Sequence, residues 1–476
     1  MGKRALKYSP IAEARTRHRL RNSHPSIPSL FLLRLLAPFY MRFVLKFNSV
    51  TIRGLDEITG AFRDFQEKRT RLILAFRHPY GEEPQLFSYV FDILLARKAR
   101  QGGSPLPGRP HARFVHGYEV ALWGDALIRW VLPRIGAVPV YHVKFDAAAM
   151  KTIRTILRDD ECPLALAPEG QVSYRSETLP RLEQGAVRMG FWCAQDIEKA
   201  GRAERVIILP LSIHYRFDPR DTKKLMAMIE RDEAACGMSR IPSDAAALAL
   251  RERLVALETT ILRITETHYS KTYGYQPPLS DIKAPGMNHA DMRQIRWNGL
   301  MDFSLDLAEH ALGISGNLQK PEDRINRVYR IRQHGWDRVY PEESIDHDCA
   351  LMWGLENRRA GEAWYAMRHM EFVDLMYYLD SEYLEDKSGT GPSFDRLVET
   401  AYNLDDLISR LMGGNFSNRS NVMRKKAVIL PGPELDISAR LAGYNTDWKE
   451  AVKTATADLA QSYLKCIKEY LDGKNE

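Results

Sequence analysis

The sequence predicts an α/β fold with a mainly parallel sheet flanked by helices, and two observations support this class. The 476 residues are 45% hydrophobic and 27% charged, which excludes disordered chains, collagen-like repeats and small disulfide scaffolds. Short apolar runs, with helical stretches between several of them, also recur through the first half of the chain. Such runs, separated by crossovers, are typical of strands buried on both faces. The runs are RLILAF (71–76), ARFVHG (112–117), AVPVY (137–141), PLALAP (163–168) and VIILPLSI (206–213).

Helical periodicity replaces this pattern after residue 217. One predicted helical face has apolar residues at 4-3-4-3 spacing: Leu250, Leu254, Leu257, Ile261 and Ile264. Strand character returns in KKAVILPGPELDIS (425–438), and a closing helix is expected from about Asp447. We therefore expect an α/β core that is followed by a large all-helical insertion or second domain. The expected parts are a basic arm and interfacial helix (1–47), the core (48–217), the helical block (218–423), and a strand and helix that return to the core (424–476).

The formal net charge of +7 belongs to one end of the chain. Residues 1–47 contain ten Lys and Arg and one acid, which gives +9, and the remaining residues have a net charge of −2. A nucleic-acid arm is disfavoured, because the rest of the chain offers no basic surface to extend it. No nucleic-acid partner is therefore expected.

The most hydrophobic segment, residues 30–47, predicts an amphipathic helix. Arg34, Arg42 and Lys46 interrupt it and Pro38 kinks it, which disfavours a spanning helix of roughly 20 uncharged residues. At about 100° per residue the three cations share one side, with Leu, Phe and Tyr on the other. This pattern is typical of a helix in the membrane interface, with the basic stretch attracted to anionic lipids. The alternative is packing against the protein's own core.

The five cysteines are scattered without CxxC spacing, so neither a disulfide framework nor a zinc knuckle is indicated, and a reducing cytosol fits best. No signal-peptide pattern is found. We therefore expect a peripheral or monotopic protein on the cytoplasmic side of a membrane. Hydrolase-elbow, P-loop, dinucleotide and HExxH motifs are absent, and the histidines lack metal-ligand spacing. No metal or cofactor is expected.

A histidine and a glutamate follow the first buried run. The predicted strand ends at Phe76, His78 comes next, and Glu83 precedes Pro84, which suits the first turn of a helix. The pair would then lie at the carboxyl edge of the sheet, where α/β folds usually place their sites. A carboxylate can fix a histidine tautomer and prepare the other ring nitrogen to take a proton from a hydroxyl. Glu82 is a less favoured orienting residue, and an ordinary polar loop is the alternative interpretation.

Ala167-Pro168-Glu169-Gly170 follows another buried run. Proline and glycine on either side of an acid predict a fixed turn that presents Glu169 at the same edge of the sheet. An ordinary turn remains the alternative.

In this order and spacing, the two features resemble the glycerolipid acyltransferase superfamily of 1-acylglycerol-3-phosphate acyltransferases. His78 with Glu83 resembles its His-x4-Asp motif, with the Glu that lipid A secondary acyltransferases use. LALAPEG (164–170) resembles the Phe-Pro-Glu-Gly motif, and LEQGAVRMG (182–190) resembles the segment that follows it. Residues 116–141 resemble the middle motif, and VIILPLSI with Pro210 resembles a late strand. The resemblance covers about residues 45–217.

The resemblance implies transfer of a fatty acyl group from acyl-CoA, or from acyl-carrier protein as a protein partner, to a lipid hydroxyl. His78 would be the general base and Glu83 its orienting partner, without an acyl-enzyme, a metal or a cofactor. Pro168, Glu169 and Gly170 would belong to the substrate-binding site. The alternative is a catalytically silent acyltransferase fold that binds lipid or docks a partner, although such a protein has no physical need of the pair.

The sequence departs from the family where members that bind a glycerol phosphate have basic residues. Gly117, His142 and Val172 stand at those positions. His116, His142, Lys144 or Arg175 could substitute from nearby, or could be ordinary loop and strand-end residues. The expected acceptor is therefore a lysophospholipid or another glycerolipid or glycolipid hydroxyl.

Overall fold

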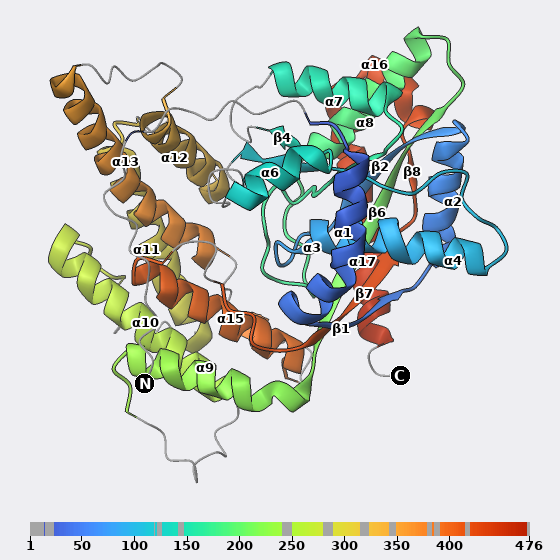
Figure 1. Cartoon of the computed structure of the whole chain (residues 1–476). Helices are drawn as coiled ribbons and strands as arrows, with labels where there is room; N and C mark the ends of the chain where they lie inside the picture. The colour runs from blue at the N-terminus through green and yellow to red at the C-terminus, as the bar shows by residue number, and fades with distance from the viewer. Residues whose placement is uncertain are drawn as a thin grey trace. The chain divides into compact units, whose positions relative to one another are not determined.

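The computed structural model describes residues 14, 23–118, 120, 126–140, 147–239, 250–278, 289–314, 323–341, 349–377, 383–384, 391–414 and 419–473. The chain divides into two compact units (Figure 1). The sheet unit contains residues 20–218 and 424–476. The helical unit contains residues 1–19 and 219–423.

The sheet unit is built on one eight-stranded sheet with the order β1-β7-β6-β2-β5-β3-β4, and β8 pairs with β6. The strands are β1 (Phe47–Ile52), β2 (Thr70–Phe76), β3 (Arg113–Gly117), β4 (Val138–Val140), β5 (Leu164–Leu166), β6 (Arg205–Phe217), β7 (Lys425–Pro431) and β8 (Leu435–Asp436).

The sheet is mixed and mostly parallel. β2 is parallel to both β5 and β6, and the pairs β3–β5, β3–β4 and β1–β7 are also parallel. β6 is antiparallel to β7 and β8. The five predicted runs all form strands, which confirms the α/β class and the largely parallel sheet. β1 begins at Phe47, one residue before the expected start of the core.

Helices cover both faces of the sheet. Ile73 and Ala75 of β2 pack in one core with side chains of α7, α8 and α17. Phe76, on the opposite face of the same strand, packs against Phe87 of α3. Figure 1 shows α17 beside β6, which it contacts. The helices after the N-terminal segment are α2 (Leu55–Gln66), α3 (Glu83–Tyr89), the π-helical η2 (Val90–Leu95), α4 (Ala96–Gln101), α6 (Ala126–Arg134), α7 (Ala147–Asp159), α8 (Gly185–Lys199), η6 (Ser438–Arg440), α16 (Leu441–Thr446) and α17 (Trp448–Asp472).

The predicted N-terminal helix is present as α1 (Ile27–Phe39), which continues into a π-helical turn, η1 (Tyr40–Val44). The predicted single charged side is not formed. Arg34 is turned onto the protein, with Nε and Nη2 donating to Asp92 at 2.9 and 2.6 Å. Lys46 lies beyond the helix with a φ of 61°.

The segment Ile27–Val44 has 18 residues, a mean hydropathy of 1.4 and only 11% burial, and is long and apolar enough to cross a membrane. This differs from the expectation that its cations disfavour a spanning helix. The reason is that this 18-residue window ends at Val44, so it contains Arg34 and Arg42 but not Lys46.

The helical unit has its own core. In its described part, regular structure is entirely helical, and α10 buries Leu254, Leu257 and Ile261, whereas Ile264 is exposed, so the predicted apolar face ends at Ile261. The fully buried Trp297 donates to Glu258 Oε1 at 3.0 Å. The helices are η3 (Pro219–Asp221), α9 (Thr222–Ala235), α10 (Leu250–Tyr273), α11 (His289–Ala311), α12 (Arg324–Val339), α13 (Ala350–Met376) and α15 (Phe394–Leu411).

Candidate active site

The predicted catalytic side chains His78 and Glu83 are in contact at the carboxyl edge of the sheet. β2 ends at Phe76 and α3 begins at Glu83, so His78 lies in the connecting loop. His78 Nδ1 lies 2.7 Å from Glu83 Oε2. The Glu83 side chain is fully buried and the His78 side chain is 19% exposed. The imidazole is therefore accessible from outside, whereas the carboxylate is not.

Three further donors hold the Glu83 carboxylate. The backbone N–H of Tyr80 donates to Oε1 at 3.0 Å, and that of Gly81 donates to Oε2 at 2.8 Å. Tyr215 Oη donates to Oε1 at 2.5 Å. Gly81 has a φ of +90°, which L side chains rarely adopt, so glycine lets the turn aim its N–H at the carboxylate. The orientation of Glu83 is thus fixed from the loop and from β6.

These contacts determine the protonation of the pair. Burial alone raises the pKa of the Glu83 carboxyl, but the hydrogen bonds and charge from His78 and Tyr215 outweigh it and lower the pKa. An ionised carboxylate only accepts hydrogen bonds, so His78 Nδ1 must carry a hydrogen. The lone pair of the neutral ring is then on Nε2, which no described residue hydrogen-bonds. His78 is therefore arranged to accept a proton at Nε2.

Tyr215 reaches Glu83 because β6 is longer than its neighbour β2. The two strands pair up to Phe76 and Leu211, and β6 continues to Phe217 against β7. The part of β6 after Leu211, which we call its overhang, extends roughly 20 Å beyond the end of β2, at about 3.3 Å per residue. Burial, followed by the charges of Glu83 and Glu82, raises the pKa of the Tyr215 hydroxyl well above its usual value. Tyr215 therefore keeps its proton and acts as a donor.

A buried lysine holds the neighbouring acid. Lys425 at the start of β7 is 2% exposed and forms an ion pair with Glu82. Its Nζ lies 5.0 Å from the ring centroid of Phe47, 5.4 Å from that of Tyr80 and 5.5 Å from that of Tyr215. Glu82, the less favoured orienting residue, is therefore bound to Lys425, and Glu83 faces His78.

Sequence reasoning missed Arg77, which joins the two predicted motifs. Its side chain is fully buried, and Nε donates to Glu169 Oε1 at 3.2 Å. Its Nη atoms donate to the carbonyls of Ser176, Arg175 and Thr178 at 2.7, 3.1 and 2.5 Å. A charged residue directly after a buried apolar run is the signal that could have indicated a buried partner. Arg77 thereby anchors the loop after β5 to the loop that carries His78.

The Pro168-Glu169-Gly170 turn lies at the predicted edge, because β5 is parallel to β2. Gly170 has a φ of +74°, and the N–H of Ser173 donates to the His78 carbonyl at 2.9 Å. The Glu169 side chain is turned inward to Arg77 and is 1% exposed. The structure thus gives Glu169 a positioning contact, and its contact with substrate stays a prediction.

The other predicted binding residues have different outcomes. Arg175 is half-buried, and its carbonyl accepts from Arg77. His142 and Lys144 lie outside the described residues. Val172 lies next to the turn that holds Glu83, since its Cγ2 is 3.7 Å from the position of a Cβ on Gly81. An apolar side chain thus lies beside the turn that holds Glu83.

The comparisons with known proteins do not assign a family. No family model matches the chain, and no curated protein matches it. Within the described ranges, no group of three or more His, Cys, Asp and Glu side chains is placed to hold a metal ion.

A second histidine–carboxylate pair lies in the same unit and differs in kind. His111 is buried, with Nδ1 2.8 Å from Asp92 and Nε2 2.9 Å from the Ile135 carbonyl. Burial lowers the pKa of His111, but the hydrogen bond and charge of Asp92 outweigh it, and the pKa is raised. Because both ring nitrogens face acceptors, His111 has no nitrogen available as a base. Its role is structural.

The raised pKa of His111 implies a pH-dependent stability. The stability that charged His111 contributes is fully present below the pKa of about 6.5 that His111 has in the unfolded chain. It is lost as pH rises through the higher pKa that His111 has in the folded protein. The free energy of unfolding should therefore fall more steeply for the wild type than for His111→Gln between about pH 6 and pH 9. Urea unfolding of both proteins across this range measures the difference. Parallel curves would contradict the assigned charge.

Proposed function

We propose that this protein is a membrane-associated O-acyltransferase that moves a fatty acyl group from acyl-CoA or acyl-carrier protein to a lipid hydroxyl. The proposal depends mainly on the arrangement of His78. Its Nδ1 lies 2.7 Å from the buried Glu83 carboxylate, and its Nε2 bonds no described residue and can accept a proton. The resemblance of the surrounding motifs to glycerolipid acyltransferases supports the same reaction.

In the proposed reaction, His78 Nε2 takes the proton of the acceptor hydroxyl as its oxygen attacks the thioester carbonyl carbon. The C–O bond forms, the C–S bond breaks, and the proton passes to the leaving thiolate. Glu83 stabilises the imidazolium that forms in between, because its pKa is lowered and it stays ionised. The donor and acceptor supply every reacting atom, so this step requires no cofactor.

The acceptor is a lysophospholipid or another lipid with a free hydroxyl. Arg77 is not available to bind a phosphate there, because Glu169 and three loop carbonyls occupy its guanidinium. Val172 adds an apolar contact beside Gly81. These contacts favour an acceptor whose phosphate, if it has one, lies away from this corner of the site.

The exposed face of the N-terminal helix supports a membrane location. Ile27, Phe31, Leu35, Phe39 and Phe43 recur every four residues and are 61–81% exposed. Exposed apolar stripes of this kind mark interaction surfaces. Because an acyltransferase-like core follows this stripe, a lipid interface is the partner that fits it best. We place the protein on the cytoplasmic side of a membrane that contains anionic lipids, held peripherally or monotopically.

The test is a thiol-release assay with palmitoyl-CoA and palmitoyl-acyl-carrier protein against a panel of acceptors. The panel contains lysophosphatidic acid, lysophosphatidylglycerol, monoacylglycerol and a glycolipid, and mass spectrometry identifies the acylated product. Release of thiol that depends on one acceptor supports the proposal. Tight binding of lipid without turnover on any acceptor would instead indicate a catalytically silent lipid-binding protein.

Tyr215→Phe should lower turnover roughly 10–150-fold, because it removes a buried hydrogen bond to a charged group, of about 1.5–3 kcal/mol. Tyr215 also helps to lower the pKa of Glu83, so the acid limb of the pH–rate profile should move to higher pH. A merely structural role would leave that limb in place. Tyr89→Phe is the matched control, since Tyr89 is half-buried in α3 and its hydroxyl bonds no described residue.

A further inference from the structure

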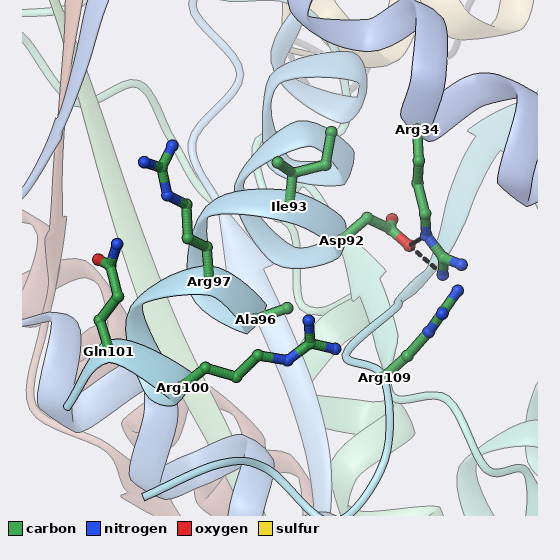
Figure 2. Close-up of a pocket in the computed structure, with 8 residues that line it drawn as sticks. All are labelled: Arg34, Asp92, Ile93, Ala96, Arg97, Arg100, Gln101 and Arg109. Atoms are coloured by element: carbon green, nitrogen blue, oxygen red, sulfur yellow. Dashed lines mark hydrogen bonds and ion pairs between the residues drawn. The ribbon is translucent and has the colours of Figure 1, made fainter. Parts of the chain in front are cut away.

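The sheet unit has an open surface pocket of about 440 Å³ whose lining includes four arginines, of which Arg97, Arg100 and Arg109 are exposed (Figure 2). Its volume falls within the range of roughly 300–1,000 Å³ that is usual for small-ligand sites. Arg34 comes from α1, Arg97 and Arg100 from α4, and Arg109 from the loop before β3. The remaining lining residues are Asp92, Ile93, Ala96 and Gln101.

The pocket has an excess of positive charge. Its lining contains four guanidinium groups and one carboxylate, which gives a net charge of +3. That carboxylate, Asp92, already accepts from Arg34 and from His111. Across the described part of the chain, no hydrogen bond or ion pair involves the side chains of Arg97, Arg100 or Arg109. An anion that binds between Arg34, Arg100 and Arg109 would therefore meet two guanidinium groups, those of Arg100 and Arg109, that bond no described residue.

Figure 2 shows that Arg34, Arg100 and Arg109 point toward one another, whereas the side chain of Arg97 points away from them. The side chain of Arg109 ends close to the guanidinium of Arg34, and Arg100 extends toward the same space from α4. Guanidinium groups donate two parallel hydrogen bonds to phosphate oxygens, which makes arginine the preferred residue for binding a phosphate. A lipid phosphate presents two free oxygens and a negative charge, so it can accept such paired hydrogen bonds from this cluster.

The pocket is separate from the candidate active site. One helical stretch runs from Glu83 through η2 to Gln101. Arg97 and Arg100 therefore lie roughly 20–25 Å along this stretch from Glu83, at about 1.5 Å per residue. Their charges have no part in the contact between His78 and Glu83.

The neighbouring surface indicates that the phosphate belongs to a lipid. Arg34, which lines the pocket, lies on the same helix as Phe31 and Leu35, and these side chains are 61% and 67% exposed. α1 thus joins a cationic pocket to an apolar surface that is suited to hydrocarbon. We propose that the pocket binds the phosphate of an anionic lipid headgroup while α1 contacts the acyl chains. The proposal rests on the membrane location in the proposed function and not on acyl transfer.

Vesicle flotation with the full chain tests the proposal. The probes are phosphatidylcholine vesicles with and without one quarter phosphatidylglycerol. Arg100→Gln combined with Arg109→Gln should weaken binding to the anionic vesicles roughly 10–30-fold, and should leave binding to the neutral vesicles unchanged. The control, Lys98→Gln with Lys151→Gln, removes the same charge from exposed positions outside the pocket, and should weaken anionic binding less than about threefold.

Each outcome separates one explanation from another. If both double variants lose the same affinity for anionic vesicles, general surface charge explains the binding and the proposed pocket is wrong. If neither variant loses affinity, the proposed pocket is also wrong. A wild type that binds neither kind of vesicle would overturn the membrane location itself. His78→Ala should bind both kinds as the wild type does, which separates this test from the chemistry.

A soluble phosphate ester is the remaining source to test. Adenosine 3′,5′-bisphosphate is added in a thermal-shift measurement on the wild type and on the Arg100→Gln/Arg109→Gln variant. If it stabilises only the wild type while vesicle binding is equal in the two, the ligand is soluble and the lipid assignment fails. Absence of stabilisation, together with the loss of anionic vesicle binding, supports the lipid.

Discussion

His78→Ala should lower turnover by roughly 10²–10⁴-fold and leave the fold intact, because general-base catalysis typically contributes that much. The variant removes His78 Nε2, the nitrogen that is proposed to accept the proton. The Glu83 carboxylate would still accept from Tyr80, Gly81 and Tyr215, so it remains satisfied in its buried position. Thiol release measures the turnover, and circular dichroism measures the fold.

His24→Ala is the matched control for this variant, since His24 is exposed in the same unit. It should keep wild-type turnover. If His78→Ala keeps more than half of the activity of the His24→Ala control, His78 is not the base, and the proposed reaction loses the observation that carries it.

Arg77→Met should lower the free energy of unfolding by about 3–5 kcal/mol, because it leaves a buried carboxylate without its partner. The variant removes all four hydrogen bonds from Arg77 and strands Glu169, whose side chain is 1% exposed. Urea unfolding measures the loss. Arg69→Met is the control, since Arg69 is 54% exposed and its surface ion pairs contribute about 1 kcal/mol or less.

A double variant tests the cause of that loss. Arg77→Met combined with Glu169→Met removes the stranded carboxylate and should regain part of the stability. A loss no larger than that of Arg69→Met, or a double variant less stable than Arg77→Met alone, would contradict the proposed link between the two loops.

The elements that the sequence predicts well are those whose residues are buried on both faces. β2 and β6 are nearly continuous apolar runs, and both are strands as expected. β1 was missed because only Phe47 in it is buried, the other residues being half-buried or exposed, and because its partner β7 comes late in the chain. The antiparallel direction of β6 against β7 likewise depends on the path of the chain between them, which local patterns do not contain.

The candidate site likewise contains residues that the local sequence predicts and residues that only the pairing of the strands brings in. His78 and Glu83 were predicted as a pair because a short loop joins them at the end of one strand. Tyr215 and Lys425 have no signal in the local sequence, since they reach Glu83 and Glu82 through the overhang of β6 and its pairing with β7. Arg77 had a signal, a charge directly after a buried strand, but its partner Glu169 becomes identifiable only when β5 is placed beside β2.

The pairing of β6 with β7 has a consequence for how the chain accommodates its helical unit. Phe217 pairs with Lys425, and the N–H of Asp218 donates to the Arg424 carbonyl at 2.9 Å. The chain therefore leaves the sheet and returns to it at adjoining points, as it would through the loop of a β-hairpin. The entropy of closing such a loop grows only with the logarithm of its length, by roughly 0.6 kcal/mol for each doubling. The pairing of β6 with β7 therefore sets almost no limit on the size of the helical unit that lies between Asp218 and Arg424. The sheet and the helical unit can each change in sequence independently of the other.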